Sequence, residues 1–247
     1  MLTRRHLLQS SAALMILPYA ARAAGHSGDT FASATGEVYV FPVSHASFAM
    51  TTPMGTVYND PVGDPAKYAD LPAADAILVT HHHGDHFNFD TLTALMGDET
   101  VLITNPTVYD KLPADLQAQA TALANGETGQ LLGMPIEAIP AYNTTKDRTK
   151  YHPKGRDNGY VLTADGLRIY IAGDTEGTDE MRALTDIDVA FVPMNLPFTM
   201  DEDAAADAVA AFAPKVVYPY HYKNSDVLAF ADALTGDTQI KMAKWYV

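Results

Sequence analysis

The stretch "HHHGDH" at residues 81–86 places four of the chain's 9 histidines beside one aspartate, directly after the apolar run "DAILVT". Alternate residues of an extended chain share a face, so His81 and His83 can point to one side while Asp85 and His86 follow around a turn. Neutral imidazoles and carboxylates are ligands of divalent transition metals, zinc above all. This spacing can therefore begin two adjacent metal sites.

The composition restricts the partners of such a site. The chain contains no cysteine, which excludes thiolate metal ligands, disulfide bonds and a cysteine nucleophile. Its formal net charge is -14 and it has no block of Lys or Arg residues, so a nucleic-acid partner is disfavoured. A small-molecule substrate is the better expectation.

Alternating and continuous apolar segments predict the elements that hold the histidine cluster. With 247 residues and 47% hydrophobic content, the chain can bury a large core. Three strands within residues 37–60 should form an antiparallel meander. No low-complexity linker divides the chain, so we expect one α/β domain with two sheets covered outside by helices. Further strands are expected at 75–80, 100–104, 134–143, 158–165, 167–175, 188–194, 215–222 and 239–247, and helices at 90–96, 201–212 and 226–234, with two short helices after Pro106 and Pro113.

Two later motifs carry further candidate ligands at the ends of expected strands. Asp174 stands in "YIAGDT" and His221 stands in "YPYHY". Taken alone, Asp174 would most often be a turn or helix-cap residue, and His221 could be a hydrogen-bonded core histidine. Their order after the histidine cluster favours a shared site.

Together these motifs resemble the metallo-β-lactamase fold superfamily of metal-dependent hydrolases. "HHHGDH" matches the superfamily's HxHxDH signature, and "YIAGDT" and "YPYHY" match its later Asp and His motifs in the same order. "YNDP" is similar to its early Asp motif, and "SHASFAM" resembles the strand that opens the ascorbate-6-phosphate-lactonase-like branch. The resemblance covers residues 36–245 and implies a four-layer αββα sandwich, in which two mixed β-sheets pack face to face with helices outside.

The resemblance also implies a set of ligands for two metals, with one departure. The superfamily has a further histidine for the first metal at a strand end, where this sequence reads "AYNTT" with Asn143. The candidate to replace it is His152 in "KYHPKGRDNGYV", a pattern similar to that of a sub-branch of the lactonase-like proteins. Asn143 itself, through its carbonyl oxygen, and a site with three protein ligands stay open. The implied ligands are His81 and His83 for the first metal, Asp85 and His86 for the second, Asp174 as the bridge and His221 to complete the second site.

Four further residues are candidates for supporting roles. Asp60 in "YNDP" would fix the orientation of a ligand, and His45 would line the pocket. Lys154 and Arg156 lie in the same loop as His152, where they could bind an anionic substrate group or be solvated loop charges.

The expected reaction follows from two adjacent cations. Held about 3.5–4 Å apart, they lower the pKa of a water between them and polarise the oxygen of the group that it attacks. We therefore expect a metal-dependent hydrolase that uses a metal-bound hydroxide, with two Zn²⁺ ions, or Mn²⁺ or Fe in their place. Asp85 would orient the hydroxide or take its proton, and the substrate would be a small ester, lactone or phosphodiester. The alternatives are a di-iron redox protein and a non-catalytic periplasmic binding protein with an impaired metal site.

The N-terminus has the pattern of an export signal. Residues 1–23 contain an Arg pair in "TRRHLLQ", an apolar run too short to span a bilayer stably, and the small-residue ending "ARA". The flanks of the Arg pair resemble a twin-arginine signal, and an ordinary Sec signal is the alternative. We expect export by the twin-arginine machinery and a periplasmic protein with no stable membrane span after cleavage. A linker would follow at residues 24–35, and the hydrolase domain at residues 36–247.

Overall fold

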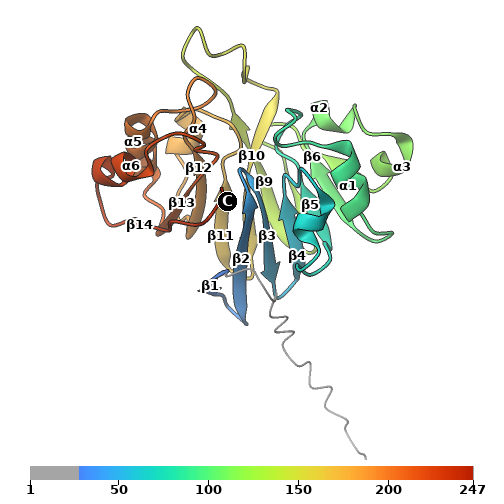
Figure 1. Cartoon of the computed structure of the whole chain (residues 1–247). Coiled ribbons are helices and arrows are strands. Elements are labelled where there is room, and N and C mark those ends of the chain that lie inside the picture. The colour runs from blue at the N-terminus through green and yellow to red at the C-terminus, as the bar shows by residue number, and fades with distance from the viewer. Residues whose placement is uncertain (1–27, 247) are drawn as a thin grey trace, which may run out of the picture.

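Two seven-stranded β-sheets pack face to face in the computed structural model, which describes residues 28–246 (Figure 1). In spatial order, the first sheet contains β1 (Asp29–Ala32), β2 (Glu37–Ser44), β3 (Ser47–Thr52), β4 (Gly55–Asn59), β5 (Ala76–Leu78), β6 (Val101–Thr104) and β7 (Ala120–Ala122). The second contains β14 (Gln239–Ile240), β13 (Val216–Tyr220), β12 (Val189–Pro193), β11 (Leu167–Ile171), β10 (Asp157–Ala164), β9 (Met134–Ala141) and β8 (Thr128–Leu131).

Both sheets follow the same plan, with antiparallel strands first and parallel strands after them. β1 to β4 form an antiparallel meander, which confirms the expectation for residues 37–60, and β4 to β7 are parallel. In the second sheet β8 to β11 are antiparallel and β11 to β14 are parallel. Each sheet is therefore mixed, as the resemblance implies.

Helices cover the outer face of each sheet and complete four layers (Figure 1). Polar side chains begin the longer helices: Asn88, Asp201 and Asp226 each accept a hydrogen bond from a free amide of the first turn. The predicted αββα sandwich is confirmed. The helices are α1 (Phe89–Leu95), α2 (Pro106–Tyr109) and α3 (Ala114–Gln117) on the first sheet, α4 (Asp179–Arg182), α5 (Glu202–Phe212) and α6 (Val227–Ala233) on the second, and a 3₁₀-helix at Pro65–Tyr68.

The core has one apolar cluster between the sheets and one beneath each helical layer. Between the sheets, Phe48 stacks on Phe191 with ring centroids 4.1 Å apart, and Phe191 stacks on Tyr218 at 4.9 Å. Trp245, which is fully buried, packs edge-on against Phe48 and Phe191. Each such burial contributes about 1.5–3 kcal/mol to folding. The C-terminal segment is thus pinned to the centre of the sandwich.

The structure differs from the expected elements mainly at the edges of the sheets. Residues 29–32 of the segment expected to be a linker form β1, which pairs with β2, so the domain begins upstream of residue 36. The last expected strand, 239–247, pairs only as β14, because the chain then leaves the sheet to bury Trp245. The short elements β7, β8 and α4 were not expected, since three or four residues are too few to show a period.

The expected export signal, residues 1–23, and the first part of the expected linker lie outside the described residues. Within residues 28–246, none of the helices has the length and apolar character needed to cross a membrane.

Candidate metal centre

The candidate ligands lie on loops at one end of the two sheets. His81 follows β5, Asp174 follows β11, and His221 directly follows β13. His45 lies in the turn between β2 and β3, and His152 lies in the loop between β9 and β10. Ligand sites on sheets with parallel strands form beyond the carboxyl ends of those strands. The fold therefore brings distant segments of the chain to one place.

Local backbone features turn the ligands inward. After β5, His86 N donates to His83 O at 2.9 Å, which closes a tight turn. Before Asp174, Gly173 has a φ of 64°, and a Cβ at this position would lie 2.7 Å from Asn158 O. Glycine is therefore required in "AGDT" both for the left-handed backbone and for the close approach of the neighbouring strand.

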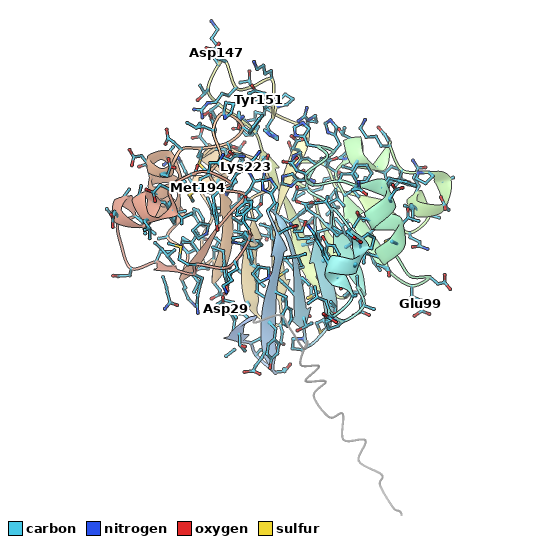
Figure 2. All side chains as sticks on the ribbon, viewed as in Figure 1. Asp29, Glu99, Asp147, Tyr151, Met194 and Lys223 are labelled. Atoms are coloured by element: carbon cyan, nitrogen blue, oxygen red, sulfur yellow. The ribbon has the colours of Figure 1, made fainter. Side chains whose placement is uncertain are left out.

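The first group of potential metal ligands consists of His81, His83, His152 and Asp174, whose donor atoms all lie within 4.8 Å of one another. His83 is partly exposed and the other three side chains are buried. His152 comes from a loop that projects beyond the sheets, with Asp147 at its tip (Figure 2). The superfamily's usual histidine of the first site is absent from this sequence. Of the candidates to replace it, the structure places His152 in the group.

Asn143 makes a separate set of contacts, and its side-chain Oδ1 is buried without a hydrogen bond to any described residue. Its Nδ2 donates to Arg148 O at 3.1 Å and to Phe198 O at 2.7 Å, while its backbone N donates to His152 O at 2.8 Å. The side chain therefore ties the loop after β9 to the segment after β12.

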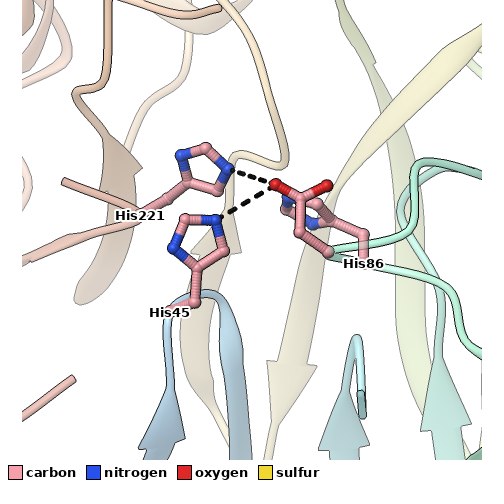
Figure 3. Close-up of side chains that lie close together, drawn as sticks. His45, His86 and His221 are labelled. Atoms are coloured by element: carbon pink, nitrogen blue, oxygen red, sulfur yellow. Dashed lines mark hydrogen bonds and ion pairs between the residues drawn. The ribbon is translucent and has the colours of Figure 1, made fainter. Parts of the chain in front are cut away.

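The second group consists of His45, Asp85, His86 and His221, again with donor atoms within 4.8 Å of one another. Figure 3 shows the three rings around one carboxylate: Asp85 Oδ2 lies 3.2 Å from His45 Nε2 and 3.4 Å from His221 Nε2. The side chain of Asp85 is 49% exposed, so this group opens to solvent on its Asp85 side. His45 lies in the group itself, closer to the expected ligands than a pocket-lining role requires.

Asp174 stands between the two groups and presents one oxygen to each. Its Oδ2 lies 3.9 Å from His81 Nε2 and 3.3 Å from His152 Nε2. Its Oδ1 lies 3.1 Å from His86 Nε2 and 3.3 Å from His221 Nε2. This is the arrangement expected of a carboxylate shared by two cations.

Buried charges of both signs face one another in this centre. Burial opposes the charge on Asp174, but the nearby rings of His221 and His86 outweigh it and hold its pKa well below the usual range. Burial also opposes protonation of His86, yet the carboxylates of Asp174 and Asp60 raise its pKa well above the usual value. For His152, carboxylate contacts outweigh burial and raise the pKa to about 8. The buried carboxylates thus favour positive charge at this centre, which divalent cations would supply.

The donor atoms of the centre fit metal ions. His81 Nε2, His86 Nε2 and Asp174 Oδ1 are buried without a hydrogen bond of normal geometry, although Asp174 Oδ1 lies 3.1 Å from His86 Nε2. His81 Nε2 faces the first group, and His86 Nε2 and Asp174 Oδ1 face the second. Imidazole and carboxylate sets of this kind suit Zn²⁺, Mn²⁺ or Fe.

Asp60 contacts His86 on the side of the ring that faces away from Asp174, as expected of a residue that fixes the orientation of a ligand. Its Oδ2 lies 2.8 Å from His86 Nδ1 and accepts a hydrogen bond from Thr80 Oγ1 at 2.7 Å. Thr80 Oγ1 in turn lies 3.0 Å from His81 Nδ1. Such contacts leave Nε2 of each ring for the metal side. The sequence analysis did not identify Thr80, since a threonine at a strand end carries no distinctive signal.

Asp157 contacts a ring of the first group in the way that Asp60 contacts His86 of the second. Asp157 was not among the residues predicted from the sequence. Its Oδ2 lies 3.0 Å from His152 Nδ1, and Arg156 donates from Nε to Oδ1 at 2.7 Å and from a terminal nitrogen to Oδ2 at 2.8 Å. The same Arg156 nitrogen lies 3.4 Å from His83 Nε2. Arg156 therefore holds the supporting carboxylate beside the ligands. The available signal was an aspartate five residues after His152 at the start of a strand.

The structure does not bring Lys154 to the centre. Its Nζ donates to Tyr142 Oη and to Glu180 Oε1, both at 3.0 Å, and the side chain is 64% exposed. This matches the alternative of a solvated loop charge.

A cavity of about 560 Å³ adjoins the second group. Tyr246 lines the cavity, and its Oη lies 2.7 Å from His45 Nδ1. One side chain therefore contacts both the cavity and the second group. Lys67 also lines it and has no ion pair with any residue of the 28–246 range. The volume is within the range of small-molecule sites. The lining residues are Val43, Ser44, Ala66, Lys67, Asp70, Trp245 and Tyr246.

Comparisons with known proteins agree with the fold. Residues 41–221 match the family model of the β-lactamase superfamily domain. A curated relative from Anaeromyxobacter dehalogenans (strain 2CP-C), named UPF0173 metal-dependent hydrolase, is 31% identical over 236 residues, which cover 85% of this chain and 85% of the relative. A relative of the same name from Thermococcus onnurineus is 32% identical over 73% of this chain and 82% of its own length.

Solved structures show the same architecture. A protein from Parabacteroides distasonis, which bears the name metal-dependent hydrolase, has 42% sequence identity and a TM-score of 0.81, covering 87% of this chain and 97% of that chain. The metallo hydrolase Igni18 from Ignicoccus hospitalis, with 23% identity and a TM-score of 0.70 over 83% of this chain and 94% of its own, shares the fold.

Proposed function

Because this chain belongs to the UPF0173 family of metal-dependent hydrolases within the β-lactamase superfamily, we propose that it holds two divalent cations and hydrolyses a small ester, lactone or phosphodiester. The number of cations is inferred from one observation. The two oxygens of Asp174 face two separate donor sets, and the donor atoms of each set lie within 4.8 Å of one another.

Each of the two donor groups would hold one cation. Zn²⁺ is the expected metal for such donors, with Mn²⁺ or Fe as the other choices. When bound, two adjacent cations supply an activated water at neutral pH and polarise the carbonyl or phosphoryl oxygen of the substrate. The first cation would be held by His81, His83, His152 and Asp174, and the second by Asp85, His86, His221 and Asp174.

Asp85 is the residue that we assign to proton transfer. Its Oδ2 is held by His45 and His221, whereas its Oδ1 makes no hydrogen bond to any described residue and the side chain is half exposed. Burial raises its pKa, but its contacts with His221 and His45 outweigh this and keep the pKa below the usual value. Oδ1 of an ionised Asp85 can orient the attacking water and accept its proton.

The cavity beside the second group gives the substrate its place. Its wall includes Tyr246, Lys67 and Asp70, and Lys67 has no ion pair with a carboxylate among the described residues. We assign to it the non-reacting part of the substrate, with an anionic group near Lys67. The motif "SHASFAM", which resembles that of the lactonase-like branch, places lactones first in a screen.

The presence of His152 in the first group bears on the binding-protein alternative. That alternative depended on Asn143 leaving the first site without a ligand, and the geometry offers His152 in its place. An intact donor set supports catalysis at both positions.

The metal content of the purified protein tests this proposal. Metal would be measured by plasma mass spectrometry after purification without chelator or histidine tag, together with hydrolysis of a panel of lactones, esters and phosphodiesters. We expect two equivalents, mainly zinc, and hydrolysis that is lost in His81→Ala but kept in the exposed control Asp98→Asn. One equivalent or none contradicts the two-cation proposal, and mainly iron with a charge-transfer absorption band would favour the redox alternative.

Export is a separate proposal that rests on the residues 1–23 alone. The motif "TRRHLLQ" supports recognition by the twin-arginine machinery and a periplasmic location. Cell fractionation should find the wild type in the periplasm and Arg4→Lys/Arg5→Lys in the cytoplasm. Equal export of both would contradict the twin-arginine assignment and favour a Sec signal.

A further inference from the structure

We propose that His45 Nε2 is an additional ligand of the second cation and that the C-terminal residues Trp245 and Tyr246 hold it in that position. This inference rests on the two-cation proposal, and it adds a residue from the first sheet to the ligands that the sequence motifs indicate.

The position of the His45 ring is the first argument. Its Nε2 belongs to the group of donor atoms within 4.8 Å that includes Asp85, His86 and His221. Its ring centroid lies 3.9 Å from that of His221 and 6.1 Å from that of His86. Figure 3 shows His45 and His221 reaching the same carboxylate from neighbouring positions. A cation among these atoms would therefore meet four side chains of this group.

The backbone of His45 is fixed on both sides in a conformation that is rare outside glycine. Its φ is 52°, in the left-handed region, which is strained for a residue with a Cβ and persists only where the surroundings impose it. Its N–H donates to Trp245 O at 3.1 Å, and its carbonyl accepts from His221 N at 3.0 Å. His221 has a similar φ of 51°. Two histidines with strained backbones are thus joined by a backbone hydrogen bond, and both rings contact the carboxylate of Asp85.

Tyr246 fixes the ring and its protonation. For Nε2 to face a cation with its lone pair, the ring proton must lie on Nδ1, and Tyr246 Oη is 2.7 Å away to accept it. Tyr246 Oη also accepts a hydrogen bond from Lys223 N at 2.8 Å. The tyrosine is therefore anchored to the loop after β13, which also carries His221.

The C-terminal segment can serve this role because its neighbour is deeply buried. Trp245 has no exposed surface and packs against Phe48 and Tyr220 at ring distances of 6.0 and 5.9 Å. Withdrawal of Trp245 would cost several kcal/mol of hydrophobic burial. Binding of the second cation is thereby coupled to the docking of the chain's last residues on the core.

An additional ligand has a consequence for metal choice. With Asp174, the second cation would have five protein donors, more than the four of a tetrahedral zinc site. Cations that accept six ligands, such as Mn²⁺ or Fe²⁺, would keep one position for water. Relative to Zn²⁺, the second site should therefore bind Mn²⁺ more tightly than the first site does.

The test compares metal binding in the full-length wild type, His45→Asn, Tyr246→Phe and the control Tyr222→Phe. Asparagine tolerates the left-handed backbone at position 45, and Tyr222 Oη has no hydrogen bond to any described residue. Each protein would be stripped of metal, checked by circular dichroism, and titrated with Mn²⁺ and with Co²⁺, whose absorption reports its coordination number.

We expect two equivalents in the wild type and in Tyr222→Phe. His45→Asn should bind the second equivalent at least tenfold more weakly, with a Co²⁺ spectrum shifted toward four-coordination, and Tyr246→Phe about tenfold more weakly. A second equivalent of unchanged Kd and spectrum in His45→Asn overturns the assignment of His45. Fewer than two equivalents in the wild type overturns the two-cation proposal itself, before any variant is compared.

Discussion

His86 Nδ1 lies 2.8 Å from Asp60 Oδ2, and both side chains are completely buried. Asp60 also accepts hydrogen bonds from Thr80 N and Thr80 Oγ1, each at 2.7 Å. The carboxylate is therefore fixed by the strand end that leads into "HHHGDH", and it fixes one ring of that motif. Only Nε2 of His86 is left to face Asp174 and a cation.

Asp60→Asn should weaken binding of the second cation about 10–100-fold. An amide would turn one N–H group toward His86 or Thr80, so the ring would lose either its orientation or its charged partner. Competition of a chelating dye for Zn²⁺ measures the change in Kd, with the exposed Asp98→Asn as the control. An unchanged second-site Kd in Asp60→Asn would show that the ring does not need this carboxylate.

Asp157→Asn should act on the first cation instead, again by about 10–100-fold in Kd. Asp157 is buried and links the guanidinium of Arg156 to His152 Nδ1, so an amide must present an N–H group to one of the two donors. The matched control is Asp147→Asn at the exposed loop tip (Figure 2). If Asp157→Asn weakened the second equivalent and left the first unchanged, the division into two groups would be wrong.

Removal of metal should destabilise the folded chain. Without cations, His81 Nε2, His86 Nε2 and Asp174 Oδ1 stay buried without well-formed hydrogen bonds. At a free metal concentration one hundred times Kd, metal binding adds about 2.7 kcal/mol to the free energy of unfolding. A chain of this size loses about 2–4 °C of Tm per kcal/mol, so differential scanning calorimetry with chelator should show a fall of about 5–10 °C. Restoring Zn²⁺ should reverse it, and superimposable scans would contradict metal binding at a buried site.

The parts of the site that could be predicted are those encoded in short motifs. His81 and His86 lie within six residues at one strand end, and Asp174 and His221 each follow a continuous apolar strand, so periodicity and order were enough. The same holds for the fold, where long strands with clear alternation were found and short edge strands were missed.

The parts that escaped prediction depend on long-range contacts. His45 lies 201 residues from Tyr246 and 40 residues from Asp85, and no local pattern marks these pairs. Asp157 is close to His152 in sequence, but its role depends on Arg156 turning back over it. The tertiary fold, and no local sequence pattern, brings these partners together.

Lys67→Ala should raise KM for anionic substrates by up to about fivefold with little change in kcat. Lys67 is exposed at the wall of the cavity, and an exposed ion pair contributes about 0–1 kcal/mol. Steady-state kinetics with a charged substrate and a neutral analogue would separate the effect from a general loss. The control is Lys215→Ala, an exposed lysine before β13, at the other end of the strand from His221. Equal KM changes for both substrates would argue against an anion site at Lys67.

The combination His152→Ala/Asn143→His should not regain the first cation that His152→Ala loses. Asn143 is buried, and its Nδ2 donates to Arg148 O and Phe198 O. A histidine there would lose these two hydrogen bonds, at a cost of about 1–3 kcal/mol in the free energy of unfolding. Plasma mass spectrometry should find one equivalent of metal in both variants, and thermal unfolding should show the double variant to be the less stable. Two equivalents in the double variant would mean that the end of β9 can still supply the ligand, and that His152 occupies a position that either segment of the chain can fill.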